Sequence, residues 1–301
     1  MSIPLAYVGV ILIWSTTPLA SQWSGQEVGF LFGITSRMLL GVIAGLTVAL
    51  VMGIRLPWHA AARRTYLAAG LGLFFAMLSV YWASQYIPSG WISVLFGMAP
   101  IVTGIMASIW LNEQALTPTR VAGMLLGVAG LAVMLLGAQS LGTSAPLGIV
   151  GMVFSVTAYS ASAVAIKRIG ADIPALATTI GGLAVTVPLL LAVYYLTGEP
   201  LPNAIPARAA MSIVYLGIIG SVLGFALYYY VLRHVEATRV ALITLVTPVI
   251  ALLLGHGLNG EPLQAEAWVG TAAILSGLLL FEYGQVINGR LECLLAMIMP
   301  E

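Results

Sequence analysis

Long apolar stretches separated by short polar corners make up almost the whole chain. Each stretch has about the 20 residues that a helix needs to cross a bilayer, and each ends at Gly, Pro or charged residues that interrupt the apolar pattern. The first stretch has no basic segment before it, so we expect a helix of the mature protein rather than a cleaved signal. The pattern predicts ten membrane-spanning helices, over residues 3–20, 29–52, 66–86, 90–111, 119–138, 146–166, 174–196, 210–231, 238–258 and 267–287.

The second half of the chain repeats landmarks of the first half. The matched pairs are Pro100 with Pro248, Glu113 with Glu261, Gly123 with Gly270 and Gly130 with Gly277, at offsets of 148, 148, 147 and 147 positions. We therefore predict two five-helix repeats, over 1–140 and 146–287, followed by a tail at 288–301. Because five is odd, the second repeat enters the membrane from the other side. Inverted repeats of this kind are typical of secondary transporters, whose substrate site lies near the midplane.

Composition excludes a soluble protein. The chain is 60% hydrophobic and 7% charged, whereas soluble domains carry about 25% charged residues. The expected class is therefore an all-α polytopic membrane protein that contacts the lipid bilayer. A formal net charge of +1 leaves no basic patch for phosphates, so no nucleic-acid partner is expected. A single cysteine, Cys293, cannot form an internal disulfide or a thiolate metal cluster.

Basic residues favour one side of the predicted membrane. With the N-terminus inside, nine of the 11 Lys and Arg residues fall in cytoplasmic loops or in the tail: Arg55, Arg63, Arg64, Arg120, Lys167, Arg168, Arg233, Arg239 and Arg290. Arg208 alone falls outside, and Arg37 falls within a span. By the positive-inside rule, this bias predicts that both termini are cytoplasmic, and it agrees with an even number of spans.

Two matched prolines are candidates for moving parts. Proline inside a helix removes a backbone hydrogen bond and kinks the segment. We expect Pro100 and Pro248 to bend helices that line a central cavity and to free the carbonyls of Phe96 and Thr244. Prolines are also common in membrane helices without any such role, which is the simpler interpretation for Pro18 and Pro188.

Deep aromatic residues are the candidates for substrate contact. Aromatic residues at span ends usually form the interfacial belt, which accounts for Trp58, Trp110, Tyr194, Tyr195 and Trp268. The predicted substrate-binding residues lie on helices expected to line the cavity: Trp14, Tyr81, Ser93, Phe96, Tyr159, Tyr229 and Thr244. Aromatic walls suit flat, apolar solutes; helix packing is the alternative for each ring.

Charge inside the membrane points to one further residue. Arg37 lies about eight residues into the second span, where a charge is a functional candidate by default; it could instead bond freed carbonyls or reach the outer interface. No acidic residue lies at the predicted midplane, so tight proton coupling is not favoured over uncoupled flux.

The chain has no catalytic motif, metal-ligand cluster or nucleotide-binding loop, so we expect neither an enzyme nor a cofactor or metal. Glu113 and Glu261 are expected to satisfy the free amides of the helix that follows each of them.

Motifs at the proline-bearing helices resemble a known family. Met98-Ala99-Pro100 through Asn112-Glu113, and Val246-Thr247-Pro248 through Gly260-Glu261, are similar to the fourth-helix pattern of the drug/metabolite transporter superfamily, specifically its ten-helix EamA-type proteins. Arg37 lies where that family often has arginine. The family's first-helix motif, tryptophan followed eight residues later by lysine, is half met, because Trp14 is followed by Gln22.

The resemblance implies an inner-membrane exporter of small metabolites that works by alternating access. Within the family, the aromatic-rich spans are most similar to the bacterial aromatic amino-acid exporters called YddG. Aromatic and other apolar amino acids, with similar drug-like compounds, are therefore the expected substrates. A broad multidrug or nucleoside exporter is the alternative within the family. A membrane-embedded transferase would need polar catalytic groups that the short loops lack, and the sequence leaves monomer and homodimer both open.

Overall fold

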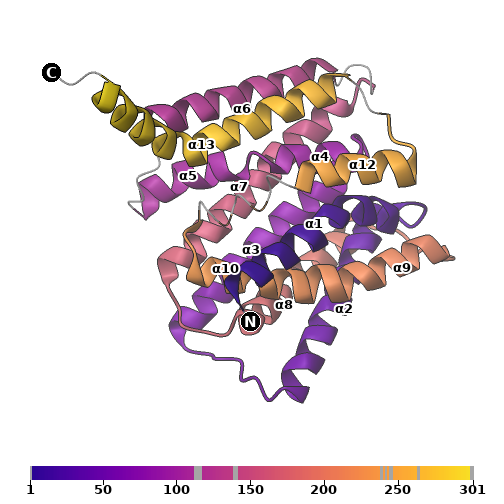
Figure 1. The fold of residues 1–301 in the computed structure, drawn as a ribbon. Helices are drawn as coiled ribbons and strands as arrows, with labels where there is room; N and C mark the ends of the chain where they lie inside the picture. The colour runs from indigo at the N-terminus through magenta and orange to yellow at the C-terminus, as the bar shows by residue number, and fades with distance from the viewer. Residues whose placement is uncertain are drawn as a thin grey trace.

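The described part of the chain consists of helices and connecting turns, without strands. In the computed structural model it comprises residues 2–111, 117–137, 142–237, 240, 243, 247–262 and 265–298. The elements in order (Figure 1) are α1 (Ile3–Gly25), α2 (Phe30–Val51), α3 (Ala60–Ala83), α4 (Ser89–Phe96), α5 (Ala99–Trp110), α6 (Pro118–Gly137), α7 (Ala145–Ile169), α8 (Ala175–Thr197), α9 (Ala207–Tyr215), the π-helix η2 (Leu216–Leu223), α10 (Gly224–His234), α12 (Thr247–Asn259) and α13 (Ala265–Ile298).

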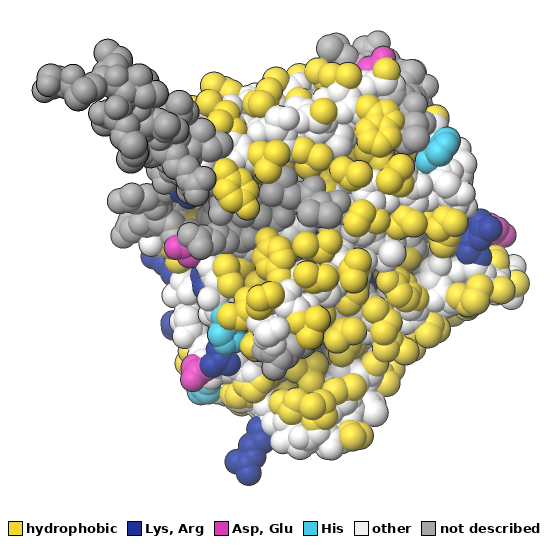
Figure 2. Space-filling view, viewed as in Figure 1, with side chains coloured by type: hydrophobic (Ala, Val, Ile, Leu, Met, Phe, Trp, Pro, Cys, Tyr) yellow, Lys and Arg dark blue, Asp and Glu magenta, His cyan; other side chains and the backbone are white. Residues whose placement is uncertain are grey.

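The helices are those of a polytopic membrane protein. Within the described ranges, seven helices or end-to-end runs of helices are long and apolar enough to cross a membrane. Two shorter apolar helices are α12 and the Ala265–Phe281 part of α13. Hydrophobic side chains cover the visible face, while Lys, Arg, Asp and Glu lie near its edges (Figure 2). Each of the ten predicted spans overlaps a described helix. The predicted all-α membrane class is confirmed.

Two predicted spans are interrupted rather than continuous. The span predicted at 90–111 is broken at Gly97 and Met98, between α4 and α5. The span predicted at 210–231 passes from α9 through the π-helix η2 into α10. Both breaks lie beside the cavity described below. The last helix differs as well, since α13 continues through most of the predicted tail to Ile298.

Helices α6 and α13 lie side by side (Figure 1) and approach through glycines. A methyl group added at Gly130 would lie 2.7 Å from the carbonyl oxygen of Gly270, and one added at Gly277 would lie 2.5 Å from that of Gly123. Such contacts are below van der Waals distance, so only glycine allows this backbone approach. Packing within one chain therefore accounts for the glycines of the predicted repeat.

A polar corner after α12 holds the start of α4. Pro88 occupies the N-cap of α4, and its side chain cannot accept a hydrogen bond from the free amides in the first turn of that helix. Glu261 supplies one: its Oε1 accepts from Ser89 N at 3.1 Å and Ser89 Oγ at 2.7 Å, and its Oε2 accepts from Gly90 N at 3.2 Å. Asn259 Nδ2 donates to the same carboxylate at 3.1 Å and to Gln22 Oε1 of α1 at 3.2 Å.

This corner corrects one expectation from the sequence. Glu261 was expected to cap the helix that follows it, α13, but its carboxylate caps α4 of the other predicted repeat. The backbone explains the direction, because Gly260 adopts a left-handed conformation (φ +63°) that turns Glu261 back toward α12, where Glu261 N donates to Gly255 O at 3.2 Å. Glu113 lies outside the described residues.

Substituting Gly123→Ala should destabilise the protein. The added methyl would overlap backbone atoms of α13 rather than a flexible side chain, and overpacking of this kind costs about 1–3 kcal/mol. We expect a lower thermal unfolding midpoint in detergent. Gly257→Ala in α12 is the matched control, because nothing lies within 4 Å of the added group and alanine favours helix. Equal midpoints for the two variants would contradict the packing.

Substituting Glu261→Gln should loosen the α4 corner. Glutamine has the same shape, but its NH₂ group would face a backbone N–H of Ser89 or Gly90 and leave that donor without an acceptor, at a cost of about 1–3 kcal/mol. The unfolding midpoint should fall more than in Glu266→Gln, since Glu266 is exposed in the first turn of α13. Similar midpoints would show that the carboxylate does not stabilise the corner.

Candidate functional site

A cavity lies among the helices of both halves of the chain. Residues of α1, α2, α3, α4, α7 and α10, with Thr247 at the start of α12, line it. It offers about 80 Å³ to the centres of water-sized molecules, enough for several waters at the ~10–15 Å³ that each needs. A solute of amino-acid size would therefore need the walls to separate or its own groups to replace that water.

Six aromatic rings form a connected cluster along one end of the cavity. Trp14 of α1 meets Tyr159 of α7 edge to face at a centroid distance of 6.0 Å, and Tyr159 meets Phe96 of α4 at 5.6 Å. Tyr228 of α10 lies 5.1 Å from Trp14 and 5.5 Å from Tyr159. The remaining contacts bring in Phe225 and Tyr229. These T-shaped and tilted pairs are the favourable aromatic geometries.

Helix α1 contributes a face that changes from aromatic to polar. Trp14, Thr17, Pro18 and Ser21 all line the cavity, and their spacing of i, i+3, i+4 and i+7 is that of one helical face. Pro18 lies inside the helix, where its ring takes the place of an amide donor. The face therefore runs from the aromatic cluster at Trp14 to a hydroxyl at Ser21.

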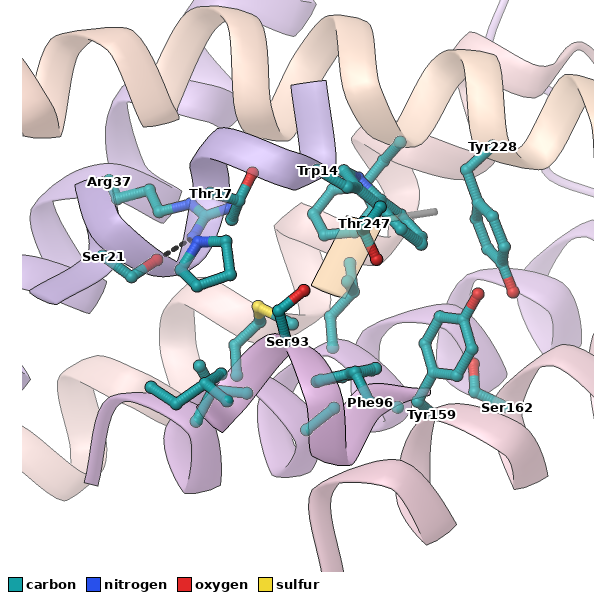
Figure 3. A pocket seen from close by; sticks show the side chains of 18 of the residues that line it. Trp14, Thr17, Ser21, Arg37, Ser93, Phe96, Tyr159, Ser162, Tyr228 and Thr247 are labelled. Carbon is teal, nitrogen blue, oxygen red and sulfur yellow. Dashed lines mark hydrogen bonds between the residues drawn. The ribbon is translucent and has the colours of Figure 1, made fainter. Parts of the chain in front are cut away.

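Arg37 of α2 lies at the other end of the cavity, away from the Tyr159 and Tyr228 rings (Figure 3). Its side chain is 1% exposed. Nε donates to Ser221 Oγ at 3.0 Å, and Nη1 donates to Ser21 Oγ at 3.2 Å. Among the described residues, no carboxylate lies within 4 Å of the guanidinium. The cation is thus held by hydroxyl dipoles from α1 and η2.

The π-helix η2 brings Ser221 to Arg37. Its wider turn changes which residues face α2, and π-helical segments recur at functional sites. Glycines allow the approach: a methyl group added at Gly217 would lie 3.2 Å from Arg37 O, and one at Gly220 would lie 3.4 Å from Arg37 Nη2. The irregular backbone therefore serves a close contact between η2 and the buried cation.

Five of the seven predicted substrate-binding residues line the cavity: Trp14, Ser93, Phe96, Tyr159 and Tyr229. Tyr81 does not line it; the side chain is fully buried, and its hydroxyl accepts a hydrogen bond from Ser24 Oγ at 3.0 Å. Thr244 lies outside the described residues. Substrate binding by any of these residues stays a prediction.

The prolines lie at helix starts. Pro100 is in the first turn of α5 and Pro248 is in the first turn of α12, where a missing N–H costs nothing and the fixed φ suits the helix. Pro100 therefore follows a break in its span rather than kinking a continuous helix as expected. A gating role for either residue stays a prediction.

Helical spacing in the sequence also indicates several lining residues that were not among the predicted ones. Phe225 and Tyr228 share a helical face with Tyr229, at i, i+3 and i+4, and all three line the cavity. Ser21 and Thr17 follow Trp14 on one face in the same way. Ser221 had no such signal, because a π-helix shifts the register after it.

The cavity as a whole is amphipathic. Apolar and aromatic groups form most of the wall, with a cation and hydroxyls at one end. No Asp or Glu is among its described lining residues, and no three His, Cys, Asp or Glu side chains of the described chain come together as a metal site. Such a cavity suits a small molecule with an apolar body and a polar or anionic end.

Comparisons with known proteins agree on one family. The model of the EamA-like transporter family matches residues 1–136 and 146–283. The uncharacterized inner membrane transporter YedA of Escherichia coli is 26% identical over 289 residues, which cover 94% of this chain and 91% of that protein. The "Probable terminal-alkyne amino-acid exporter" of Streptantibioticus cattleyicolor is 26% identical over 281 residues, covering 89% and 92%. A crystal structure at 22% identity has the same fold, with a TM-score of 0.70 over 94% of this chain and 98% of that one.

Substituting Trp14→Ala should slow the uptake of a labelled aromatic amino acid, the solute class expected from the sequence, by roughly tenfold or more. The change removes the ring that contacts Tyr159, Tyr228 and Phe225, and losing one buried aromatic contact surface is worth about 1.5–3 kcal/mol. Initial rates in proteoliposomes, normalised to folded protein, measure the effect. Trp58→Ala is the control, because Trp58 is 73% exposed and does not line the cavity. Unchanged uptake in Trp14→Ala would remove the ring from the site.

Proposed function

This chain belongs to the EamA-like transporter family, and we propose that it exports small aromatic and other apolar amino acids, with similar compounds, across the inner membrane. The observation that carries the proposal is the cavity between the two halves, with its aromatic cluster at one end and Arg37 at the other. Flat apolar side chains fit the ring faces, and polar groups fit the hydroxyl-bearing end. The relative named as an amino-acid exporter supports the same substrate class.

Alternating access is the mechanism that we propose, through two inverted repeats. The family model matches each half of the chain separately. Glycine contacts between the predicted repeats are reciprocal: Gly123 meets Gly277, the equivalent of Gly130, and Gly130 meets Gly270, the equivalent of Gly123. A two-fold axis would require such an exchange. Repeats of opposite orientation would allow the same cavity to open to either side in turn.

We propose that the N-terminus faces the cytoplasm. Loops that follow α2, α7 and α10 meet at one end of the molecule, where Tyr66 packs against Ile173, and Arg233 donates to Ile173 O at 3.1 Å and pairs with Asp172. The basic residues of these loops would then lie inside, as the positive-inside rule expects. The Glu261 corner would then lie at the outer end.

Facilitated flux is the coupling mode that we propose. Proton-coupled carriers commonly use an intramembrane carboxylate, and the described lining residues of this cavity include none. Substrate would then move down its own gradient, which for an exporter follows from accumulation inside the cell.

Purified protein in proteoliposomes should take up labelled tryptophan. Vesicles are either empty or preloaded with unlabelled amino acids, with no pH gradient. We expect uptake in both cases, reduced by external phenylalanine or methionine. Uptake only into preloaded vesicles would show obligatory exchange instead of facilitated flux.

Protein-free vesicles and vesicles with heat-unfolded protein are the controls. If no amino acid moves under any of these conditions, the amino-acid assignment is wrong, and drug-like compounds and nucleosides become the solutes to test.

A further inference from the structure

We propose that Arg37 binds a carboxylate of the transported molecule and that the site does not require an ammonium group. The substrates would then be monocarboxylates with an apolar body, including keto acids and aryl-alkanoates as well as amino acids. This inference deepens the proposed function and rests on it.

The first support is a buried cation without a counter-charge. Arg37 is 1% exposed, and in the described chain no carboxylate is within 4 Å of it. The hydroxyls of Ser21 and Ser221 provide hydrogen bonds but no negative charge. An uncompensated charge in the membrane interior is costly, so an anion that enters the cavity would gain a strong charge-assisted interaction there.

The second support is that the guanidinium is oriented but not saturated. Arginine has five N–H donors; one at Nε is taken by Ser221 and one at Nη1 by Ser21. The other donors, on Nη1 and Nη2, have no partner among the described residues. Arg37 also lines the cavity. A guanidinium fixed by two serines and open at its remaining edge matches the planar, two-oxygen geometry of a carboxylate.

The third support comes from the aromatic end of the cavity, opposite Arg37. Figure 3 shows Trp14 and Thr247 between Arg37 and the pair of Tyr159 and Tyr228. A molecule with its carboxylate at Arg37 would extend its apolar part toward these rings. An ammonium group would find no carboxylate among the described lining residues. Only ring faces and hydroxyls would receive it, and these attract a cation far less than a buried charge pair attracts an anion.

A purely structural role is the competing explanation. Arg37 connects α1, α2 and η2 through its two serines, and it could serve only to hold these helices together. In that case the charge of the solute end that reaches Arg37 would not matter. Analogues with one charged group removed separate the two explanations without any change to the protein.

The test uses wild-type protein in proteoliposomes and inhibition of labelled phenylalanine uptake. The competitors are 3-phenylpropanoate, which lacks the ammonium group, and 2-phenylethylamine and phenylalaninamide, which lack the carboxylate. We expect 3-phenylpropanoate to inhibit within about tenfold of unlabelled phenylalanine, and the two amines to inhibit at least ~30-fold more weakly. Amines as effective as 3-phenylpropanoate, or no inhibition by 3-phenylpropanoate, would overturn the proposal while leaving amino-acid transport intact.

Absence of phenylalanine uptake would be a failure of the proposed function, so direct uptake of labelled 3-phenylpropanoate is measured in parallel. Its uptake, without that of 2-phenylethylamine, supports the carboxylate subsite independently. If phenylalanine, 3-phenylpropanoate and 2-phenylethylamine all fail to enter the vesicles, both proposals are overturned.

Ser221 is a positioning residue, and Ser221→Ala tests that role. Ser221 does not line the cavity, but its Oγ accepts from Arg37 Nε. We expect the half-inhibitory concentration of 3-phenylpropanoate to rise about five- to tenfold, while that of neutral 3-phenylpropan-1-ol stays the same. Ser155→Ala is the matched control, since it removes an equally buried serine hydroxyl that donates to Ala76 O at 2.8 Å rather than bonding Arg37. Equal shifts for both inhibitors, or for both variants, would show a structural role alone.

Discussion

Polar groups inside a membrane cannot form hydrogen bonds with water, so they must find partners within the protein. This constraint organises the whole chain. Backbone amides and carbonyls are satisfied within helices, so every interruption needs a replacement partner. At the start of α4, where Pro88 provides no cap, the carboxylate of Glu261 supplies it. At η2, the altered turn coincides with the contact between Ser221 and Arg37. Irregular backbone is found where another part of the chain, or the cavity, can accept it.

The same constraint divides the helices by task. Helices α6 and α13 meet backbone to backbone through glycines and have few contacts with the cavity-lining helices (Figure 1). The cavity is lined by α1, α2, α3 and α7, together with α4, which ends at a break, and α10, which follows the π-helix. The closely packed pair α6 and α13 thus lies apart from the cavity, whose wall combines continuous and interrupted helices.

Much of this arrangement was readable from the sequence. Apolar stretches predicted the helices, and depth within spans expected to line the cavity predicted five of its lining residues. Tyr81 shows the limit of that reasoning. It lies 148 positions before Tyr229, the offset of the matched prolines, yet its hydroxyl bonds Ser24 outside the cavity, because the rotation of each helix depends on packing against several others. Glu261 shows the same limit, since the helix that it caps lies about 170 residues away in the chain.

The make-up of the cavity wall has a consequence for ion flow. The described lining of the cavity is mostly apolar and aromatic and includes no carboxylate that could replace the water around Na⁺ or K⁺. Arg37 repels cations further. Apolar constrictions of this kind are barriers to ion flow. We therefore expect the cavity to conduct Na⁺ and K⁺ poorly while a solute with an apolar body occupies it.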